Sequence, residues 1–450
     1  MDTAGLGRDE LRSPLEAPAT ASERIGLEIE CGVVDPRTGL ATPYPGRNGM
    51  RAVLEAVLAE WDGKVLFDAG EPVGVELADG GLIGLEHGGQ LEYSGPPVAD
   101  LATAVDDVRL TLVRLAELLR RFDLALLPGA YLPFDRIETV PWVPLSRGPI
   151  LRGHFERFDG AGNGGVRLLP LSTCTQVNLD YLSEDDFTQK LRMQAAASPV
   201  IAALLVNSPL YGGRLDGLLS HRCRDWLLTD PQRSGLVRPA LRGDVGIDDV
   251  VDWALSIPMV YYQDRTGGLR PAPPDRPFAS LLRDGFADGA RPLFSHWTAH
   301  LAQIWTHVRV RRTLELRAAD GPAYQNLQVV PALWTGLSYH APSRDAAWEL
   351  LRHYSAGQLQ SAAEDFPAEG LRTMLGGDRV HELAGELVRL AREGLRARAA
   401  AGLERPETPS YLDPLDEVLH TGRTFAEQCA HLWETDLRRD PRRYVAHFRV

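Results

Sequence analysis

Four short stretches of the chain alternate apolar and polar residues, and an alternation with a period of two predicts β-strands. The stretches lie at residues 25–31, 85–93, 175–180 and 313–317. Side chains at positions i and i+2 share one face of a strand, so each stretch has an aliphatic face and a polar face. Parallel strands that are buried on both faces read instead as continuous apolar runs. We therefore expect one antiparallel sheet whose aliphatic face packs inward.

The polar faces of these strands carry carboxylates and amides. The residues that share a face are Glu28 with Glu30, Gln90 with Glu92, Gln176 with Asn178, and Glu315 with Arg317. One such pair alone is more often the solvated face of an edge strand, but four pairs in one chain favour a sheet face built from oxygen ligands. Carboxylates held close together repel unless cations lie among them. Hard oxygen ligands suit Mg²⁺ or Mn²⁺, so the pattern predicts metal–nucleotide chemistry.

Apolar residues that recur every three or four positions predict the helices. The expected helices span residues 101–122, 184–206, 343–363, 379–401 and 416–438. Ser183 is a suitable N-cap for the second helix, and Pro199 predicts an interruption within it.

The chain shows no clear domain boundary. Residues 1–21 are polar and lack periodicity, which predicts a disordered lead-in. We expect residues 22–450 to form a single α+β catalytic domain in which residues 342–450 are mainly helical.

Composition narrows the classes of function. The 48 basic and 61 acidic residues give a net charge of −13, which makes a nucleic-acid partner unlikely. The only lysines are Lys64 and Lys190, so a Walker-type phosphate loop is excluded and arginine must recognise most anions. The N-terminus has no secretory signal layout and no apolar run approaches membrane-spanning length, so we expect a cytoplasmic protein without a membrane partner.

Seven segments resemble, in order, the plant-type glutamate–cysteine ligase family. They are GLEIE (26–30), LEHGGQLEYSGPP (85–97), VPLSRGPILR (143–152), STCTQVNLDYLSEDD (172–186), VNSPLYGGRLDGLLSHRCRDW (206–226), VVDWALSIPM (250–259) and VRVRRTLELRAADG (308–321). No single segment is diagnostic, but their order and number make chance agreement improbable. The resemblance extends from about residue 24 to residue 340.

This resemblance implies a glutamine-synthetase-like antiparallel sheet that forms an active-site funnel, flanked by helices. It also implies an ATP- and Mg²⁺-dependent ligase (Mn²⁺ is the alternative ion), which phosphorylates the γ-carboxylate of glutamate and couples it to the amine of cysteine. The product would be γ-glutamylcysteine, an intermediate of thiol biosynthesis such as that of glutathione. The partners would be these small molecules, and the protein would be a monomer or a homodimer.

Matching motif positions also implies roles for individual residues. The implied metal ligands are Glu28, Glu30, Glu86, Glu92 and Glu315. Glu315 and Arg317 are the candidate catalytic residues, and the candidate ATP-binding residues are Arg309, Arg311 and Arg317. The candidate substrate-binding residues are Gln176, Asn178, Arg152, Arg222 and Trp226, with Arg152 chosen over the nearby Arg147.

Several departures from the family pattern concern the acceptor amine. His87 replaces the proline of the family's Glu-Pro-Gly-Gly, and Trp305-Thr306-His307 replaces its Phe-Pro-Glu. A γ-glutamyl ligase that uses another amine in a specialised pathway is therefore an alternative. A catalytically inactive homologue that binds nucleotide or amino acid is a third hypothesis.

Overall fold

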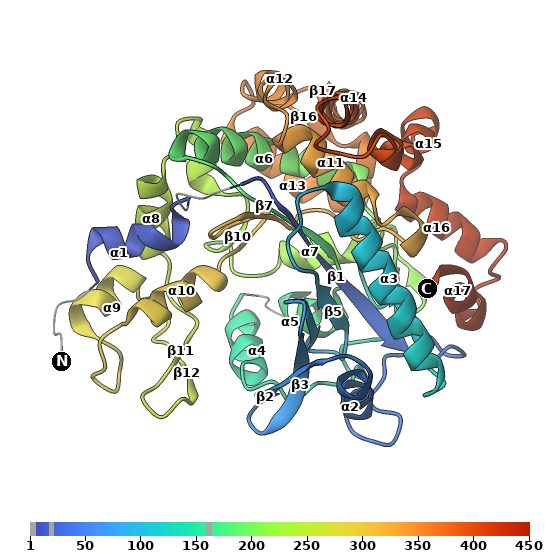
Figure 1. Cartoon of the computed structure of the whole chain (residues 1–450), viewed down its shortest axis with the longest axis horizontal. Helices are drawn as coiled ribbons and strands as arrows, with labels where there is room; N and C mark the ends of the chain where they lie inside the picture. The colour runs from blue at the N-terminus through green and yellow to red at the C-terminus, as the bar shows by residue number, and fades with distance from the viewer. Residues whose placement is uncertain (1–5, 18–21, 159–163) are drawn as a thin grey trace.

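A central antiparallel sheet organises the structure (Figure 1), a computed structural model that describes residues 6–17, 22–158 and 164–450. Within these residues the sheet has nine strands in the order β14-β15-β7-β1-β5-β4-β3-β2, and β6 also pairs with β1. The strands are β1 (Ile25–Val34), β2 (Gly63–Asp68), β3 (Glu71–Leu77), β4 (Leu82–Leu85), β5 (Leu91–Ser94), β6 (Ala125–Pro128), β7 (Thr175–Leu179), β14 (Val308–Val310) and β15 (Leu314–Leu316).

The register of this sheet brings the polar residues of four strands onto one face. Glu28 of β1 lies opposite Gln176 of β7, and Glu30 lies opposite Glu92 of β5. On the far side of β7, Glu315 lies opposite Asn178. Directly opposed residues in an antiparallel pair point to the same face. The predicted antiparallel arrangement of these strands is therefore confirmed.

The stretch 85–93 is not one strand, contrary to the prediction. β4 ends at Leu85 and β5 begins at Leu91, and the two are joined by a turn. Gly89 has φ of +83°, and a Cβ on Gly88 would lie 2.0 Å from the carbonyl oxygen of Pro170. Two glycines are therefore required where this turn passes close to another backbone. The turn also separates Gln90 from the polar face, because its amide donates to the Ser172 carbonyl.

Helices cover both sides of the sheet (Figure 1). They are α2 (Met50–Glu60), α3 (Leu101–Arg120), α4 (Gly148–Glu156), α5 (Gly164–Leu171), α6 (Glu184–Leu204), α7 (His221–Trp226), α8 (Ile247–Ser256), α9 (Phe278–Asp284), α10 (Phe294–Ala302), α11 (Val329–Ser338), α12 (Ala341–Leu351), α13 (Ala356–Glu369), α14 (Val380–Ala400), α15 (Pro414–Thr421), α16 (Phe425–Glu434) and α17 (Pro441–Phe448). The short pairs are β8 (Leu210–Tyr211) with β9 (Arg214–Leu215), β10 (Ser234–Gly235) with β13 (Trp305–Thr306), β11 (Tyr261–Gln263) with β12 (Leu269–Pro271), and β16 (Met374–Leu375) with β17 (Asp378–Arg379).

Two of the predicted helices show how local sequence sets their ends. The amphipathic helix predicted at 101–122 is α3, which packs its apolar stripe against β1 and β6. The Ser183 side chain caps α6 by accepting from the backbone N–H of Asp186. The interruption predicted at Pro199 is wrong, because α6 continues through it. Burial on nearly all sides of this part of α6 outweighs the loss of one backbone donor.

The C-terminal part is helical as predicted, but in shorter pieces. The helix predicted at 343–363 is two helices, α12 and α13, since Ser355 starts the second with a capping box. The helix predicted at 379–401 is α14, which is confirmed. The one predicted at 416–438 divides at Gly422, whose φ of +67° ends α15 before Thr424 caps α16.

The N-terminal segment differs from the predicted disordered lead-in over its described part. Residues 8–12 form α1 (Arg8–Arg12), and Leu11 and Leu15 are buried. The carbonyl of Leu11 accepts from the indole of Trp297, so the segment packs against α10. Two leucines four residues apart are enough to anchor so short a helix here. Residues 1–5 and 18–21 of the predicted lead-in lie outside the described residues.

These elements confirm the predicted fold class, an antiparallel sheet flanked by helices with a mainly helical C-terminal part. The apolar face of the sheet and the helices packed on it form the main core. The opposite, polar face is left open beside α4, α5 and α7, and a cavity lies over it.

Candidate active site

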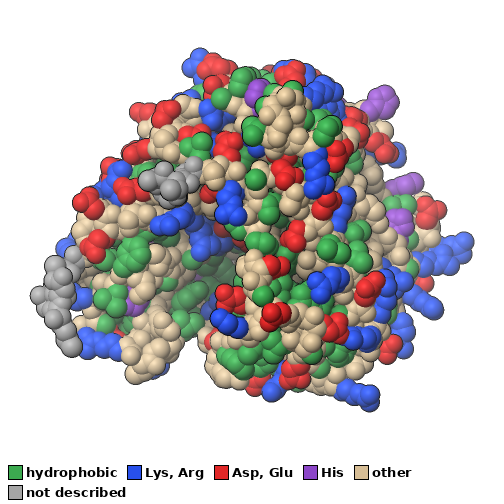
Figure 2. Space-filling view, viewed as in Figure 1, with side chains coloured by type: hydrophobic (Ala, Val, Ile, Leu, Met, Phe, Trp, Pro, Cys, Tyr) green, Lys and Arg blue, Asp and Glu red, His purple; other side chains and the backbone are tan. Residues whose placement is uncertain are grey.

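A cavity of about 430 Å³ lies over the polar face of the sheet. Its floor comes from β1, β5, β7 and β14 and from Arg317, which directly follows β15. Its walls come from α4, α5, α7 and the segments at Tyr261 and Trp305. Figure 2 shows this face of the molecule hollowed between α10, β11 and β12 on one side and β2, β3 and α4 on the other. The sheet register thus places the polar residues of distant segments at one opening.

Three carboxylates of the floor, Glu28, Glu30 and Glu92, have no ion-pair partner among the described residues. The amides of Asn178 and Gln176 donate to Glu28 and Glu30 at 2.9 and 3.0 Å. Burial raises the pKa of all three, and neighbouring carboxylates raise it further. The pKa of Glu30 rises to about 7, with Glu86 the main charged neighbour, and that of Glu92 rises well above its usual range. Ionising these three carboxylates is therefore unfavourable until a cation lies among them.

At the β15 end of the floor, a carboxylate is fully neutralised by arginine. Both guanidinium nitrogens Nε and Nη2 of Arg309 bind Glu315, at 2.7 and 2.8 Å. Arg317 also bonds to Glu315 and to the side-chain oxygen of Gln176. Burial would raise the pKa of Glu315, but the two arginine charges outweigh it and lower the pKa to about 2. The Nε of Arg317 is buried beside the cavity and has no hydrogen-bond partner in the described part of the chain.

Glu86 sits in the β4–β5 turn beside an arginine. The Nη2 of Arg147 lies 3.1 Å from Glu86, and the charge of Arg147 outweighs burial, so the pKa of Glu86 is lowered. The Nε of Arg147 donates to Nε2 of His87 at 3.4 Å. Burial lowers the pKa of His87 to about 4, so its imidazole is neutral near pH 7 and can accept this bond.

The donor set of the floor fits a divalent cation. Carboxylate oxygens are the ligands that Mg²⁺ and Mn²⁺ prefer, and a cation would offset the mutual repulsion of Glu28, Glu30 and Glu92. In the described ranges no three Asp, Glu, His or Cys side chains already converge as a complete metal site. Bringing these carboxylates around one ion therefore requires side-chain rotation.

The wall of the cavity is apolar and aromatic. Leu151 and Phe155, one turn apart on α4, face the cavity together with Trp226 at the end of α7. The ring of Phe155 packs edge-on against Trp305 with centroids 5.4 Å apart. The predicted contact residue Trp226 is therefore in the cavity, and the wall opposite the charged floor offers an apolar surface to a substrate.

The structure separates two predicted substrate-binding residues from this cavity. Arg152 is exposed and stacks on Trp142, with its guanidinium 4.4 Å from the ring centroid. Arg222 is buried, and its guanidinium donates to the carbonyls of Arg317 and Ala319. Neither residue lines the cavity, so the structure does not bring these two arginines together with the other predicted site residues, and their contact with substrate stays a prediction. Arg222 instead holds the loop that follows β15.

In the segment at 143–152, Arg147 lines the cavity and the predicted residue Arg152 does not. α4 begins at Gly148 with Arg147 as its N-cap, so Arg147, Leu151 and Phe155 follow one face at spacings of four. Arg152 lies one residue further round the helix and points away. The sequence did contain a signal that favours Arg147. The apolar residues Leu151 and Phe155 lie four and eight residues after Arg147, and they mark the face of the helix that points inward. His87 was noted only as a departure from a motif, yet it lines the cavity.

The remaining predicted residues lie at the floor or its rim. Gln176 and Arg309 line the cavity, and Arg311 lines it as an exposed residue at the rim. Asn178 bonds to Glu28 and Thr313 at the edge of the floor. The sheet thus brings together the predicted metal ligands and ATP-binding arginines.

Comparison with known proteins gives this geometry a context. A model of the glutamate–cysteine ligase family 2 (GCS2) matches residues 24–444. The chloroplastic glutamate–cysteine ligase of Arabidopsis thaliana is 31% identical over 96% of this chain and 80% of its own length. That of Brassica juncea is 28% identical over 96% and 82%. A crystal structure of the Francisella tularensis glutamate–cysteine ligase with AMP superposes with a TM-score of 0.56 at 11% identity, covering 96% of this chain and 90% of that one, and so supports the fold.

The protein is thus an ATP-dependent ligase that forms a carbon–nitrogen bond, a class that implies ATP and a divalent metal ion. Within that class, the chain belongs to glutamate–cysteine ligase family 2. The predicted family is confirmed, and the match extends through the C-terminal helices, well beyond the segments that first suggested it.

The comparisons contradict the predicted cytoplasmic location. The Arabidopsis, Brassica, rice and tobacco relatives are all named as chloroplastic proteins. The prediction used only the lack of a secretory signal layout. That test is blind to plastid targeting, because transit peptides have no central apolar segment. Separately, none of the described helices is both long and apolar enough to span a bilayer.

Proposed function

We propose that this protein joins the γ-carboxylate of L-glutamate to the amine of L-cysteine and forms γ-glutamylcysteine. The γ-carboxylate first attacks the terminal phosphorus of ATP, which releases ADP and leaves an acyl phosphate. The cysteine nitrogen then attacks the acyl carbon, the C–O bond to phosphate breaks, and inorganic phosphate leaves. The amine loses a proton, and the new amide completes the reaction.

The observation that carries this proposal is the contrast within one cavity floor. Glu28, Glu30 and Glu92 have raised pKa values and no ion-pair partner among the described residues, whereas two guanidinium groups bind Glu315 nearby. Phosphoryl transfer needs cations on both sides of the reacting group. An unbalanced carboxylate cluster beside fixed arginines is the arrangement that a metal–nucleotide substrate would complete.

Glu28, Glu30 and Glu92 are the ligands we propose for Mg²⁺, and that ion would neutralise charge on the phosphates of ATP when bound. The predicted ligand roles of Glu86 and Glu315 stay predictions, since each already binds arginine. We assign to Arg317 the stabilisation of charge on the transferring phosphoryl group, because its buried Nε has no hydrogen-bond partner among the described residues. Arg309 fixes the carboxylate that orients Arg317, and Arg311 at the rim would meet the nucleotide.

Glutamate and the acceptor would lie between floor and wall. Gln176 faces the cavity and is the residue we propose for glutamate, with Asn178 orienting Glu28 beside it. Arg147, and not the predicted Arg152, has its guanidinium in the cavity, and we propose that it binds a carboxylate of the substrate. The apolar wall of Phe155, Trp226 and Trp305 would hold the acceptor side chain and exclude water from the acyl phosphate.

A second candidate is a ligase with the same glutamate chemistry and a different amine. Two departures from the family pattern, His87 and Trp305, both line the cavity, so they can change the acceptor without changing the floor. The oligomeric state, monomer or homodimer, stays a prediction.

One assay separates these functions. The protein is incubated with ATP, Mg²⁺ and glutamate and with a panel of amines, while ADP and product mass are followed. Cysteine-dependent ADP release with γ-glutamylcysteine as product supports the proposal, and turnover with only another amine supports the second candidate. A folded protein that releases no ADP with any amine would instead be a binding homologue.

A further inference from the structure

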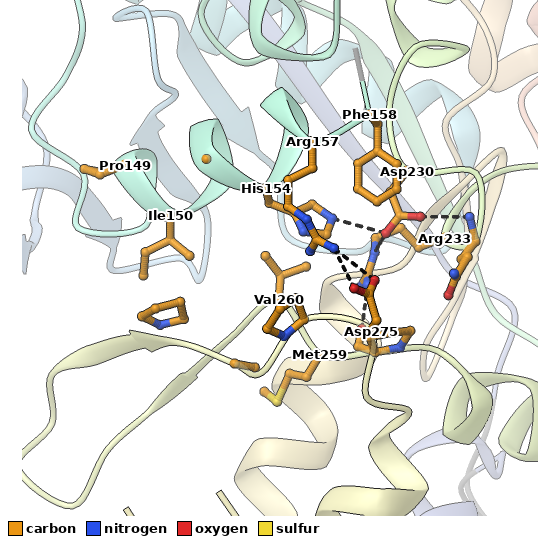
Figure 3. A pocket seen from close by; sticks show the side chains of 16 residues that line it. Pro149, Ile150, His154, Arg157, Phe158, Asp230, Arg233, Met259, Val260 and Asp275 are labelled. Carbon is orange, nitrogen blue, oxygen red and sulfur yellow. Dashed lines mark hydrogen bonds and ion pairs between the residues drawn. The ribbon is translucent and has the colours of Figure 1, made fainter. Parts of the chain in front are cut away.

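A second cavity, of about 420 Å³, lies on the other side of α4 from the catalytic cavity. Its lining shares no residue with that of the catalytic cavity. α4 serves both, because Leu151 and Phe155 face the catalytic cavity whereas Ile150 and His154 face the second one. Figure 3 shows Ile150 reaching from α4 into this space, with Val260, the residue just before β11, below it.

The body of the second cavity is apolar. Ile150, Met259 and Val260 line it together with proline rings from three segments, at Pro149, Pro258 and Pro271. Proline rings and branched side chains form flat, rigid surfaces that lose little conformational entropy when a ligand binds. Such walls suit a planar ring better than a flexible chain.

Every charge in the lining is already paired. Asp230 accepts from Nε of Arg233 at 2.6 Å and lies 3.1 Å from Nε2 of His154. Arg157 binds both oxygens of Asp275, at 2.9 and 2.8 Å, and these pairs are drawn as dashed lines in Figure 3. A charged ligand would have to break one of these pairs to gain a partner. The cavity therefore favours a neutral ligand.

Hydrogen-bonding groups remain at one end of the cavity. The Gln232 side chain makes no hydrogen bond to another described residue, and its amide offers one acceptor and two donors. The second ring nitrogen of His154, Nδ1, is likewise without a partner among the described residues. A ligand with a donor and an acceptor on one edge would satisfy both groups.

We propose that this cavity is a second small-molecule site, for a neutral planar heteroaromatic compound with hydrogen-bonding atoms on one edge. It is separate from the catalytic cavity, so its ligand binds while the substrates of the ligase are bound. The proposed reaction does not use it.

Benzimidazole is a suitable probe, because it is planar, is neutral at pH 8 and carries one donor and one acceptor. Its binding to the full chain is measured by calorimetry and ligand-observed NMR with Mg²⁺ and a non-hydrolysable ATP analogue at saturation. We expect one benzimidazole per chain. Ile150→Trp fills the apolar end and should weaken binding by about tenfold or more.

A matched control places the same side chain elsewhere. Val113 is exposed on α3, so Val113→Trp should leave benzimidazole binding unchanged. Gln232 is exposed at the polar end, and Gln232→Leu should weaken binding by about threefold or more without affecting the fold. ADP release by the same preparations reports on the ligase reaction independently.

Three results would overturn the proposal. They are no binding up to the solubility limit of benzimidazole, binding that the ATP analogue displaces, and binding that survives both Ile150→Trp and Gln232→Leu. A preparation that binds benzimidazole but makes no product would contradict the proposed function and leave the second site standing.

Discussion

A buried carboxylate on one side of α4 and a cluster of three on the other have pKa values shifted in opposite directions. On one side, Asp230 is bound by Arg233 and His154, and their hydrogen bonds and charge outweigh burial, so its pKa is lowered. On the other side, Glu28, Glu30 and Glu92 form no ion pair with any described residue, and their pKa values are raised. A paired carboxylate stabilises the fold, whereas unpaired ones cost stability until a ligand arrives. Asp230 therefore belongs to the structural support of the site, whereas Glu28, Glu30 and Glu92 belong to the surface that we propose binds ligand.

The paired side supports the wall of the catalytic cavity. Arg233 donates to the carbonyls of Pro258 and Gln303, and its own carbonyl accepts from the backbone N–H of Trp305. His154 ties α4 to the same ion pair. The wall is therefore held by several hydrogen bonds, whereas the carboxylates of the floor repel one another. That division is common at active sites, where function is supported at the expense of stability.

The largest expected effect is on catalysis at the floor. Arg317→Ala removes the guanidinium that we propose for the phosphoryl group, so kcat for ADP formation should fall by about 10³-fold. Glu315 keeps Arg309, so the thermal transition should stay near that of the wild type. The control Arg224→Ala removes an exposed arginine of α7 and should leave kcat unchanged. A near wild-type rate in folded Arg317→Ala would remove this residue from the mechanism.

The next effect is on stability, at the paired carboxylate. Asp230→Asn leaves Arg233 buried without its counter-ion and should lower the free energy of unfolding by about 3 kcal/mol. Denaturant unfolding at pH 7 measures the loss. Asp284→Asn breaks an exposed ion pair with Arg276 and should cost less than about 1 kcal/mol. Equal losses from the two variants would contradict the role given to Asp230.

The same variant tests the sign of the pH dependence. The pKa of Asp230 is lower in the folded protein than in the unfolded chain, so its stabilisation is complete above about pH 4. It is lost as the pH falls from there toward the folded pKa. The difference in stability between wild type and Asp230→Asn should therefore narrow below about pH 4. If the difference in stability between the two proteins instead widens as the pH falls, the pKa of Asp230 is not lowered in the folded protein.

A smaller effect is expected at the wall. Trp305→Phe keeps an aromatic ring beside Phe155 but enlarges the pocket, so the KM for the amine should rise by about tenfold or less. The KM for ATP should not change. Trp142→Phe, at a ring that stacks on Arg152 outside the cavity, provides the control. If the KM for ATP rises with that for the amine, the wall does not hold the acceptor.

The floor could be predicted from the sequence because strand alternation fixes which residues share a face. Glu28, Glu30 and Gln176 lie where the period of two places them, and the family pattern added their probable chemistry. The wall could not be predicted in the same way. Choosing between Arg147 and Arg152 needed the start of α4, and the burial of Arg222 depended on the loop after β15. Helix starts and loop contacts depend on tertiary packing, which a local pattern does not record.

Tertiary packing also explains why two predictions about the helices were wrong. The chain continues as a helix through Pro199 because α6 is enclosed by neighbouring elements, and it folds as α1 near the N-terminus because Leu11 meets α10. In both places the burial of the segment by distant parts of the chain decides the structure, and the local sequence does not reveal that burial. The domain assignment of residues 22–450 stays a prediction.

The most direct test of the account is the sign of the stability change in Glu92→Gln. Without divalent metal at pH 8, replacing one of the facing carboxylates, whose ionisation is disfavoured in the folded protein, should raise Tm by about 1–2 °C. With saturating Mg²⁺ and ATP the wild type should have the higher Tm, because it gains more stability from binding than the variant does. Glu76→Gln, at an exposed position of β3, should change neither value. If Glu92→Gln instead lowers Tm without metal, or gains as much as the wild type from Mg²⁺ and ATP, the floor is not a cation site.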